Sequence, residues 1–135
     1  MPKPPVVAEL TWTEALSFDV TSARIATVVD GDSTAGASPV QMLVIGLAGC
    51  MAADVVDIVR KGRHRITGFR AHIIAERAPE PPTRILSARL RFQIEGDVPS
   101  TAVERAIALS RDKYCSVWHS LRPDIQLTTV FDITP

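Results

Sequence analysis

The most apolar part of the chain lies over residues 39–61 and has the spacing of a helix. Four large apolar side chains recur one turn apart, namely Leu43, Leu47, Met51 and Val55. Over residues 42–53 the apolar character runs nearly all round, which is typical of a helix buried from several directions. Ser38 suits the N-cap and Pro39 the first helical position. We therefore predict a long central helix over 39–61.

The segments before and after this helix have the patterns of strands. Residues 84–96 alternate between apolar and polar side chains, which predicts one buried and one solvated face. Other segments are rich in β-branched or aromatic residues. They predict further strands over residues 6–12, 23–30, 68–77 and 124–134.

Two shorter helices are expected late in the chain. Residues 99–113 carry an apolar stripe after Ser100, and residues 116–122 form a second, short helical segment that ends before Pro123. No repeat, low-complexity tract or linker divides the sequence. We predict a single α+β domain over residues 1–135, with the long helix packed against an antiparallel sheet.

Composition and charge narrow the range of partners. The chain has 135 residues, of which 46% are hydrophobic, and fifteen basic residues balance fifteen acidic ones. A net charge of zero gives no electrostatic reason to expect nucleic acid or an anionic membrane as partner. Neither a run of about 18 consecutive apolar residues nor a signal-peptide pattern is evident. We expect a cytoplasmic protein that binds neither nucleic acid nor membranes.

Two cysteines, Cys50 and Cys115, are the first candidates for chemistry. Cys50 lies within the long helix, and Cys115 lies where one predicted helix ends and another begins. A helix N-terminus stabilises a thiolate and lowers the thiol pKa. The alternative is that both are inert core thiols, because cysteine is among the most frequently buried residue types.

Gly46 and Gly49 precede Cys50 on one face of the same helix. Glycine inside a helix costs roughly 1 kcal/mol relative to alanine and often marks the close approach of another backbone. We expect a second helix to cross there, which is compatible with either an ordinary packing contact or a functional site.

The histidines give weaker signals. His64, His72 and His119 lack the spacing of a metal site, and no cofactor is expected. His119 follows Cys115 by one helical turn and could activate its thiol, although an exposed helix residue is the simpler interpretation.

Two carboxylates, Asp54 and Asp57, lie three residues apart on the long helix. They could act as a pair. The simpler interpretation is a solvated helix end, in which ion pairs to Arg60 and Lys61 balance their charge.

Two segments resemble the signature segments of a known family. Residues 38–63, "SPVQMLVIGLAGCMAADVVDIVRKGR", and residues 106–121, "AIALSRDKYCSVWHSL", are similar to those of the OsmC/Ohr family, with its YhfA-like branch as the best match. The resemblance extends over essentially the whole chain. It implies an OsmC-like α+β fold in an intertwined homodimer whose long helices pack together.

Characterised members of this family are thiol peroxidases that reduce organic hydroperoxides. The resemblance implies that Cys50 is the peroxidatic cysteine, which attacks the peroxide and becomes a sulfenic acid. Cys115 would be the resolving cysteine, which condenses with it to a disulfide. An external dithiol would then reduce the pair by exchange, with no bound cofactor.

The sequence departs from the active family pattern at two positions. Active members carry a glutamate just after the proline that begins the helix, whereas this chain has Val40 and Gln41. They also carry an arginine near the N-terminal strands, for which Arg24 is the candidate here. Gln41 can donate and accept hydrogen bonds but forms no ion pair. Two alternatives therefore stay open: a pocket that binds an apolar or thiol-bearing small molecule without turnover, or a redox sensor in a stress response.

Overall fold

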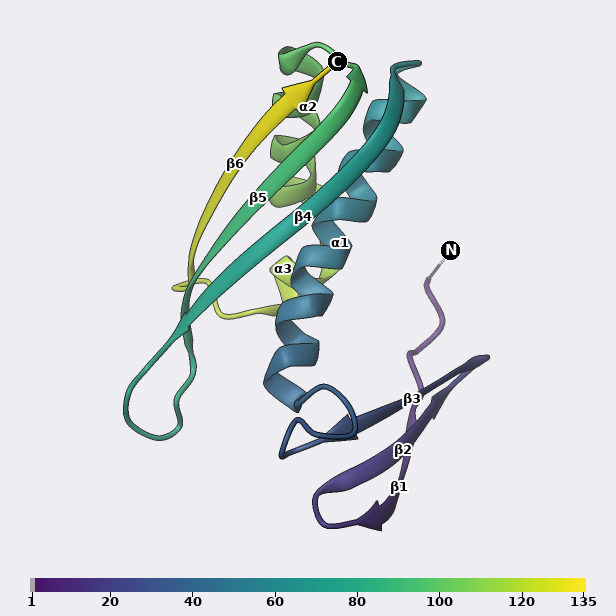
Figure 1. The fold of residues 1–135 in the computed structure, drawn as a ribbon, viewed down its shortest axis with the longest axis vertical. Coiled ribbons are helices and arrows are strands. Elements are labelled where there is room, and N and C mark those ends of the chain that lie inside the picture. The colour runs from purple at the N-terminus through teal and green to yellow at the C-terminus, as the bar shows by residue number, and fades with distance from the viewer. Residues whose placement is uncertain (1) are drawn as a thin grey trace. The chain divides into compact units, whose positions relative to one another are not determined.

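A computed structural model describes residues 2–135. The chain divides into two compact units, Met1–Leu43 and Val44–Pro135. The first unit contains a three-stranded antiparallel sheet in the order β1-β2-β3 (Figure 1). Its strands are β1 (Glu9–Glu14), β2 (Ser17–Ser22) and β3 (Ile25–Asp30). The prediction of one domain over residues 1–135 is not decided by this division and stays a prediction.

The first sheet has almost no core of its own. Among its described residues only Ser17, Val29 and Asp30 are buried. Several large apolar side chains are exposed instead, namely Val6, Val7, Leu10, Trp12, Leu16 and Ile25. A small sheet needs an apolar face packed against something to be stable in water. The chain leaves that face of the first sheet uncovered.

The long helix α1 (Pro39–Lys61) begins at a reciprocal cap. The backbone N–H of Gln41 donates to Ser38 Oγ at 3.1 Å, and the Ser38 N–H donates to Gln41 Oε1 at 2.8 Å. Gln41 Oε1 also accepts from the Ser33 hydroxyl at 2.6 Å. This is the capping-box arrangement, and it confirms Ser38 as the residue that caps the helix. The side-chain oxygen of Gln41 therefore has a structural role.

We expect Gln41→Ala to lower the free energy of unfolding by about 1 kcal/mol, because the variant loses the reciprocal half of the cap. Gln41→Glu is the matched control, since glutamate at the same position keeps an oxygen acceptor for the Ser38 N–H. Urea unfolding followed by circular dichroism measures both. Equal stability of Gln41→Ala and the wild type would contradict the structural role of Gln41.

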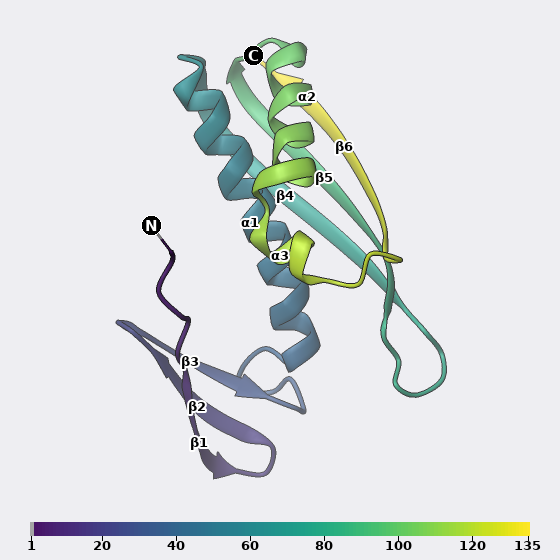
Figure 2. The ribbon, with the colours of Figure 1, turned by 180° about the vertical axis from the view of Figure 1, so that it is seen from behind.

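Helix α1 packs in the second unit on one face of a second sheet (Figures 1 and 2). The sheet has the order β4-β5-β6, formed by β4 (Arg65–Arg77), β5 (Ile85–Asp97) and β6 (Gln126–Thr134). The buried side chains of α1 recur every four residues: Leu47, Met51, Val55 and Val59. Three of them belong to the predicted stripe, whereas its first member, Leu43, is exposed. This part of the molecule holds the hydrophobic core.

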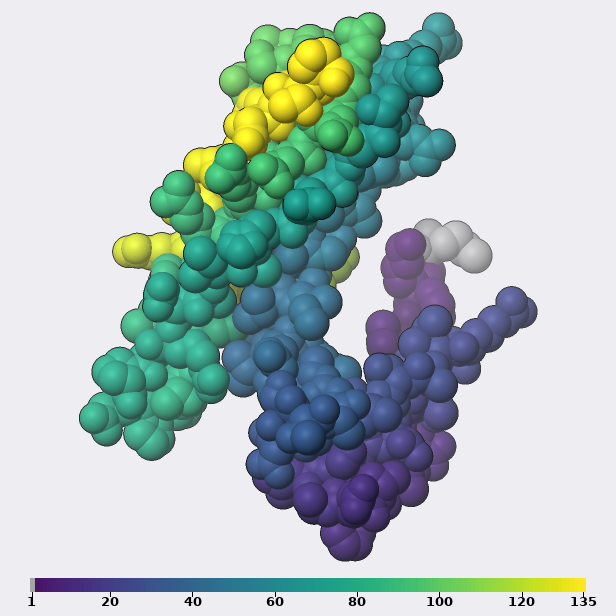
Figure 3. All heavy atoms as spheres, in the orientation of Figure 1, coloured from purple at the N-terminus to yellow at the C-terminus, as the bar shows by residue number. Residues whose placement is uncertain are grey.

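Strand β5 alternates as its sequence predicts. Its core side chains Ala88, Leu90, Phe92 and Ile94 are at most 2% exposed. The residues between them are exposed on the opposite face of the sheet, which is turned toward the viewer in Figure 3. The ring of Phe92 also contacts Phe69 on β4, with ring centroids 5.6 Å apart. The central strand therefore supplies much of the core.

The prediction of a purely antiparallel sheet is wrong for the second sheet. Strand β4 pairs with β5 antiparallel, but β6 pairs with β5 in parallel. The physical reason is the connection between β5 and β6. It contains α2 (Ser100–Leu109), the π-helical segment η1 (Ser110–Tyr114) and α3 (Ser116–Ser120), and such a helical crossover returns the chain to run parallel.

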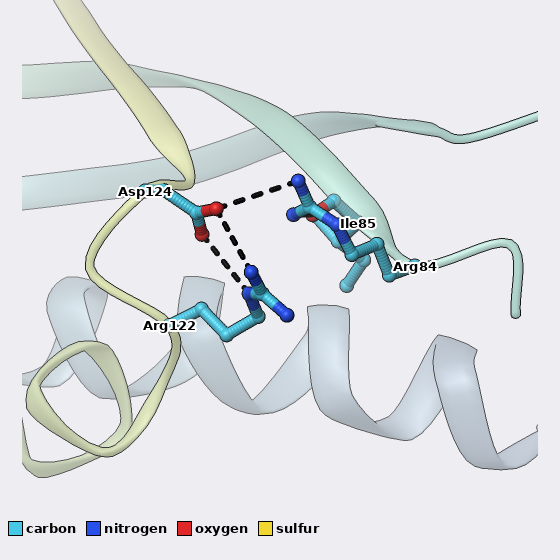
Figure 4. Close-up of polar contacts among 4 residues, drawn as sticks. All are labelled: Arg84, Ile85, Arg122 and Asp124. Carbon is cyan, nitrogen blue, oxygen red and sulfur yellow. Dashed lines mark hydrogen bonds and ion pairs between the residues drawn. The ribbon is translucent and has the colours of Figure 1, made fainter.

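The end of this crossover is tied to the start of β5 by a small ion-pair network (Figure 4). Arg122 donates two hydrogen bonds to Asp124, at 3.1 and 3.0 Å, and Arg84 lies 3.4 Å from the same carboxylate. The hydrogen bonds from Arg122 hold the pKa of Asp124 below its ordinary value, against the opposing effect of burial. The network joins the segment after α3 to β5.

The chain has no run of about 18 consecutive apolar residues, but helix α1 is long and apolar enough to span a bilayer by length and composition. Four of its side chains are instead buried in the core of the second unit, and the core helix of a soluble protein meets the same criterion. The cytoplasmic location and the lack of a membrane partner stay predictions.

Candidate functional site

The two cysteines, far apart in sequence, come together in the second unit. Cys50 lies on α1, and Cys115 is the N-cap residue of α3. Both are free thiols, and their sulfur atoms and a carboxylate oxygen of Asp54 all lie within 4.8 Å of one another. Cys115 is fully buried, whereas Cys50 is partly exposed. The two sulfur atoms are therefore neighbours in space, although they are not bonded to each other.

The π-helical segment η1 prepares the position of Cys115. The backbone N–H of Cys115 donates to the Ser110 carbonyl at 2.8 Å, five residues back in the chain. Single turns of this kind often occur at functional sites. Ser110, which is fully buried, also donates its hydroxyl to Asp54 Oδ2 at 2.8 Å. One segment therefore places Cys115 and orients the carboxylate beside it.

The interpretation of Asp54 as part of a solvated helix end is wrong. Asp54 is half-buried beside the two thiols, because it follows Cys50 by four residues and so shares its helix face. Asp57 does behave as expected, since its carboxylate lies 2.9 Å from Lys61 Nζ and both side chains are exposed. The cysteine-to-aspartate spacing in the sequence was the signal that could have identified Asp54.

Burial governs the protonation of Cys115. It is the largest cause that raises the pKa of this thiol, to about 11, and the neighbouring Cys50 and Asp54 add to the increase. The Trp118 N–H donates to Cys115 Sγ at 3.3 Å and acts in the opposite direction, as expected at a helix N-terminus. Burial outweighs it, so the expected lowering of the pKa is wrong for Cys115. This residue is a protonated thiol at neutral pH.

His119 does not contact the Cys115 thiol. Its ring nitrogen Nε2 lies 2.9 Å from the Arg111 carbonyl, and the side chain is exposed. In the part of the chain that the structure describes, His119 is therefore an exposed helix residue, as the simpler interpretation expected.

Arg24 and Gln41 lie in the first unit, whereas the thiols lie in the second. Arg24 is an exposed residue in the turn between β2 and β3, and Gln41 is in the first turn of α1. The catalytic roles expected of these two residues stay predictions.

We expected another backbone to lie close to Gly46 and Gly49. Within the described residues 2–135, no backbone does so. A Cβ atom built on either glycine would meet no atom within 4 Å. Ile45, next to Gly46, has an exposed fraction of 60%. This part of the helix surface is apolar and partly exposed.

Comparisons with known proteins agree with this architecture. The model of the OsmC-like protein family matches residues 30–130. Protein YhfA of Escherichia coli is 35% identical over 129 residues, which cover 93% of this chain and 96% of that protein. Two solved structures share the fold. An OsmC-like protein from Mycoplasma pneumoniae has a TM-score of 0.85 at 15% identity, with 99% of this chain and 100% of that chain covered.

The second is described as an organic hydroperoxide resistance protein OsmC from Legionella pneumophila. It has a TM-score of 0.71 at 11% identity, with 98% of this chain and 99% of that chain covered. The resemblance seen in the two sequence segments is thus confirmed by the family model, by a relative over nearly the full length and by the fold. The chain belongs to the OsmC/Ohr family, in the branch of YhfA.

Proposed function

We propose that the protein is a thiol-dependent reductase of organic hydroperoxides. The observation that carries this proposal is the pair of free thiols, one partly exposed and one buried, which lie close enough to form a disulfide. Solved relatives described as organic hydroperoxide resistance proteins, such as OhrB of Bacillus subtilis, support the proposed substrate class. We place the activity in the cytoplasm, where reduced dithiols are available.

In the proposed reaction the Cys50 thiolate attacks the O–O bond of the hydroperoxide. The bond breaks, an alcohol leaves, and Cys50 becomes a sulfenic acid. The Cys115 sulfur then attacks the Cys50 sulfur, which forms the disulfide and releases water. An external dithiol reduces the disulfide by exchange and is itself oxidised. One hydroperoxide and one dithiol thus give one alcohol, one water and one oxidised dithiol.

The accessibility of the two thiols supports this assignment of roles. Cys50 is partly exposed, so a hydroperoxide can reach its sulfur, whereas Cys115 has no exposed surface. A thiol that stays protonated at neutral pH is also a poor first nucleophile, because the thiolate is the reactive form. The raised pKa of Cys115 is compatible with the second step, in which the attack is intramolecular.

Cys50→Ser is expected to abolish dithiol-dependent consumption of an organic hydroperoxide such as cumene hydroperoxide, because serine cannot form a sulfenic acid. Ala53→Ser, on the exposed surface of the same helix, is the control and should retain activity. Consumption is followed from the residual hydroperoxide after addition of a dithiol. Unchanged turnover in Cys50→Ser would show that the proposed nucleophile is wrong.

A second candidate function is a non-catalytic OsmC-like protein that binds a small molecule or senses oxidants. The absence of a carboxylate at Val40 and Gln41, and the use of Gln41 Oε1 in the helix cap, favour it. Native mass spectrometry of the purified protein distinguishes the candidates. A retained apolar or thiol-bearing ligand together with no hydroperoxide turnover would support binding without catalysis.

We further propose that the protein works as a homodimer. Apolar residues of both units are left exposed, including Ile45 on α1 and Trp12 and Ile25 on the first sheet. In a symmetric dimer, the apolar patch of each copy would cover the same patch of the other copy. Gly46 and Gly49 would then allow the close approach of a helix from that copy.

Ile45→Asp is expected to convert a dimer into monomers, because the charge would be buried against an apolar surface. Ala108→Asp, an exposed position on α2, is the matched control and should remain dimeric. Sedimentation equilibrium measures the mass of each variant. A wild-type monomer at micromolar concentration, or a protein that partitions into detergent micelles, would contradict this proposal.

A further inference from the structure

The thiol pair and the carboxylate beside it form a set of possible metal ligands, of which the proposed redox reaction uses only the two thiols. Cys50 and Asp54 come from α1, and Cys115 comes from the junction of η1 and α3. We propose that these three side chains bind a thiophilic divalent cation, foremost Zn²⁺, when the thiols are reduced. The cation is released when the disulfide forms. Only the release rests on the proposed function; the binding does not.

The geometry of the three side chains suits a metal site. The two sulfur atoms and the carboxylate oxygen lie within 4.8 Å of one another before any cation is bound. Two sulfurs that bind tetrahedral Zn²⁺ at about 2.3 Å each are about 3.8 Å apart. The three ligands therefore need only small side-chain rotations to reach the cation. Sites with three protein ligands keep a fourth position for water or another small ligand.

Hydrogen bonds around the three side chains also favour metal binding. The buried Ser110 hydroxyl donates to Asp54 Oδ2 at 2.8 Å and so orients the carboxylate toward the sulfurs. The Trp118 N–H donates to Cys115 Sγ at 3.3 Å, a contact that also stabilises a metal-bound thiolate. Such outer contacts fix the direction of metal ligands and raise affinity. Cys50 is the more accessible of the two sulfur ligands.

The charge of the site also favours a cation. Among residues 2–135, Asp54 has no lysine, arginine or histidine nitrogen within ion-pair distance, and its hydrogen-bond partner is the neutral Ser110. The carboxylate therefore lies beside the two sulfur atoms with no cationic side chain of these residues as a partner. A divalent cation would supply that positive charge. Two sulfur ligands favour Zn²⁺ over Mg²⁺ or Ca²⁺, which prefer oxygen ligands.

Such a site would connect cation binding to the redox state. A disulfide sulfur carries no thiolate charge, so formation of a Cys50–Cys115 bond removes two of the three ligands. Reduction by a dithiol restores them. The bound cation would in turn keep both sulfurs as thiolates and hold them apart.

The test is an anaerobic titration of the reduced protein with Co²⁺, whose thiolate complexes absorb in the near ultraviolet, with Zn²⁺ as competitor. We expect saturation at about one Co²⁺ per chain and full displacement by Zn²⁺. Asp54→Asn and Ser110→Ala should weaken binding by about 10- to 100-fold. Cys50→Ser should remove the charge-transfer band. Asp57→Asn, one turn further along α1, is the matched control and should bind as the wild type does.

Cys115 is in the core, so Cys115→Ala is used beside Cys115→Ser, and circular dichroism verifies that each variant is folded. Binding of Co²⁺ without a thiolate charge-transfer band, or binding that survives Cys50→Ser, would overturn the proposal. Cation binding without hydroperoxide turnover would support it while the proposed reductase activity fails. Turnover without cation binding would overturn the proposed metal site and leave the proposed reductase activity intact. Oxidation with diamide should abolish binding once the disulfide has formed.

Discussion

Cys115→Ser is expected to stop the catalytic cycle after its first step. Cys50 can still react with one hydroperoxide, but its sulfenic acid has no neighbouring thiol with which to condense. Steady-state turnover should fall by about 100-fold or more, because an attack within the molecule is replaced by one from solution. Dimedone should trap the sulfenic acid on Cys50 in this variant, and mass spectrometry of the labelled peptide measures the adduct.

The control for this variant concerns folding. Serine places a hydroxyl in a fully buried position and costs about 1 to 3 kcal/mol if that hydroxyl lacks a partner, so Cys115→Ala is measured beside it. In the wild type the disulfide step should become faster between about pH 7 and 9, because the thiolate is the attacking form. The rate rises with pH because the pKa of the Cys115 thiol is about 11, so its thiolate fraction grows over this range. No accumulation of sulfenic acid in either variant would refute the assignment of Cys115 as the resolving residue.

Phe92→Ala should have the largest effect on stability. Phe92 lies on the central strand of the second sheet, is fully buried and contacts the ring of Phe69. Truncation to alanine removes the buried ring and leaves a cavity. We therefore expect the free energy of unfolding to fall by about 3 to 5 kcal/mol.

Gln93→Ala is the matched control, because the next side chain along β5 is exposed on the other face of the sheet. Chemical denaturation with a two-state analysis measures both variants. A loss below about 1 kcal/mol for Phe92→Ala would contradict the placement of this ring in the core.

The elements of the second unit could be predicted from the sequence because their periodicity is strong. The four-residue spacing of Leu47, Met51 and Val55 and the alternation of β5 both match buried side chains in the structure. Burial of the long helix from several directions stays a prediction, because Ile45 is exposed. The parallel pairing of β6 was missed, although a helical segment between two strands is itself the signal for it. Local patterns predict elements more readily than they predict the direction in which strands pair.

The candidate site was only half predictable. The two cysteines were identified from the sequence, but their approach depends on the whole fold of the second unit. Asp54 was misjudged because an acidic residue near a helix end is usually solvated, and here a helical turn places it against Cys50 instead. Ser110 carried no signal at all. Its role follows from the π-helical turn, which a hydrophobic pattern does not show.

In the proposed reaction Cys50 and Cys115 act as one redox pair. Treatment of the reduced protein with one equivalent of an organic hydroperoxide, followed by peptide mapping by mass spectrometry without reduction, tests this pairing. We expect a single cross-linked peptide that joins Cys50 to Cys115 within one chain, and a dithiol should restore both thiols. Two free thiols after this treatment, or a disulfide that joins one chain to another, would contradict this pairing.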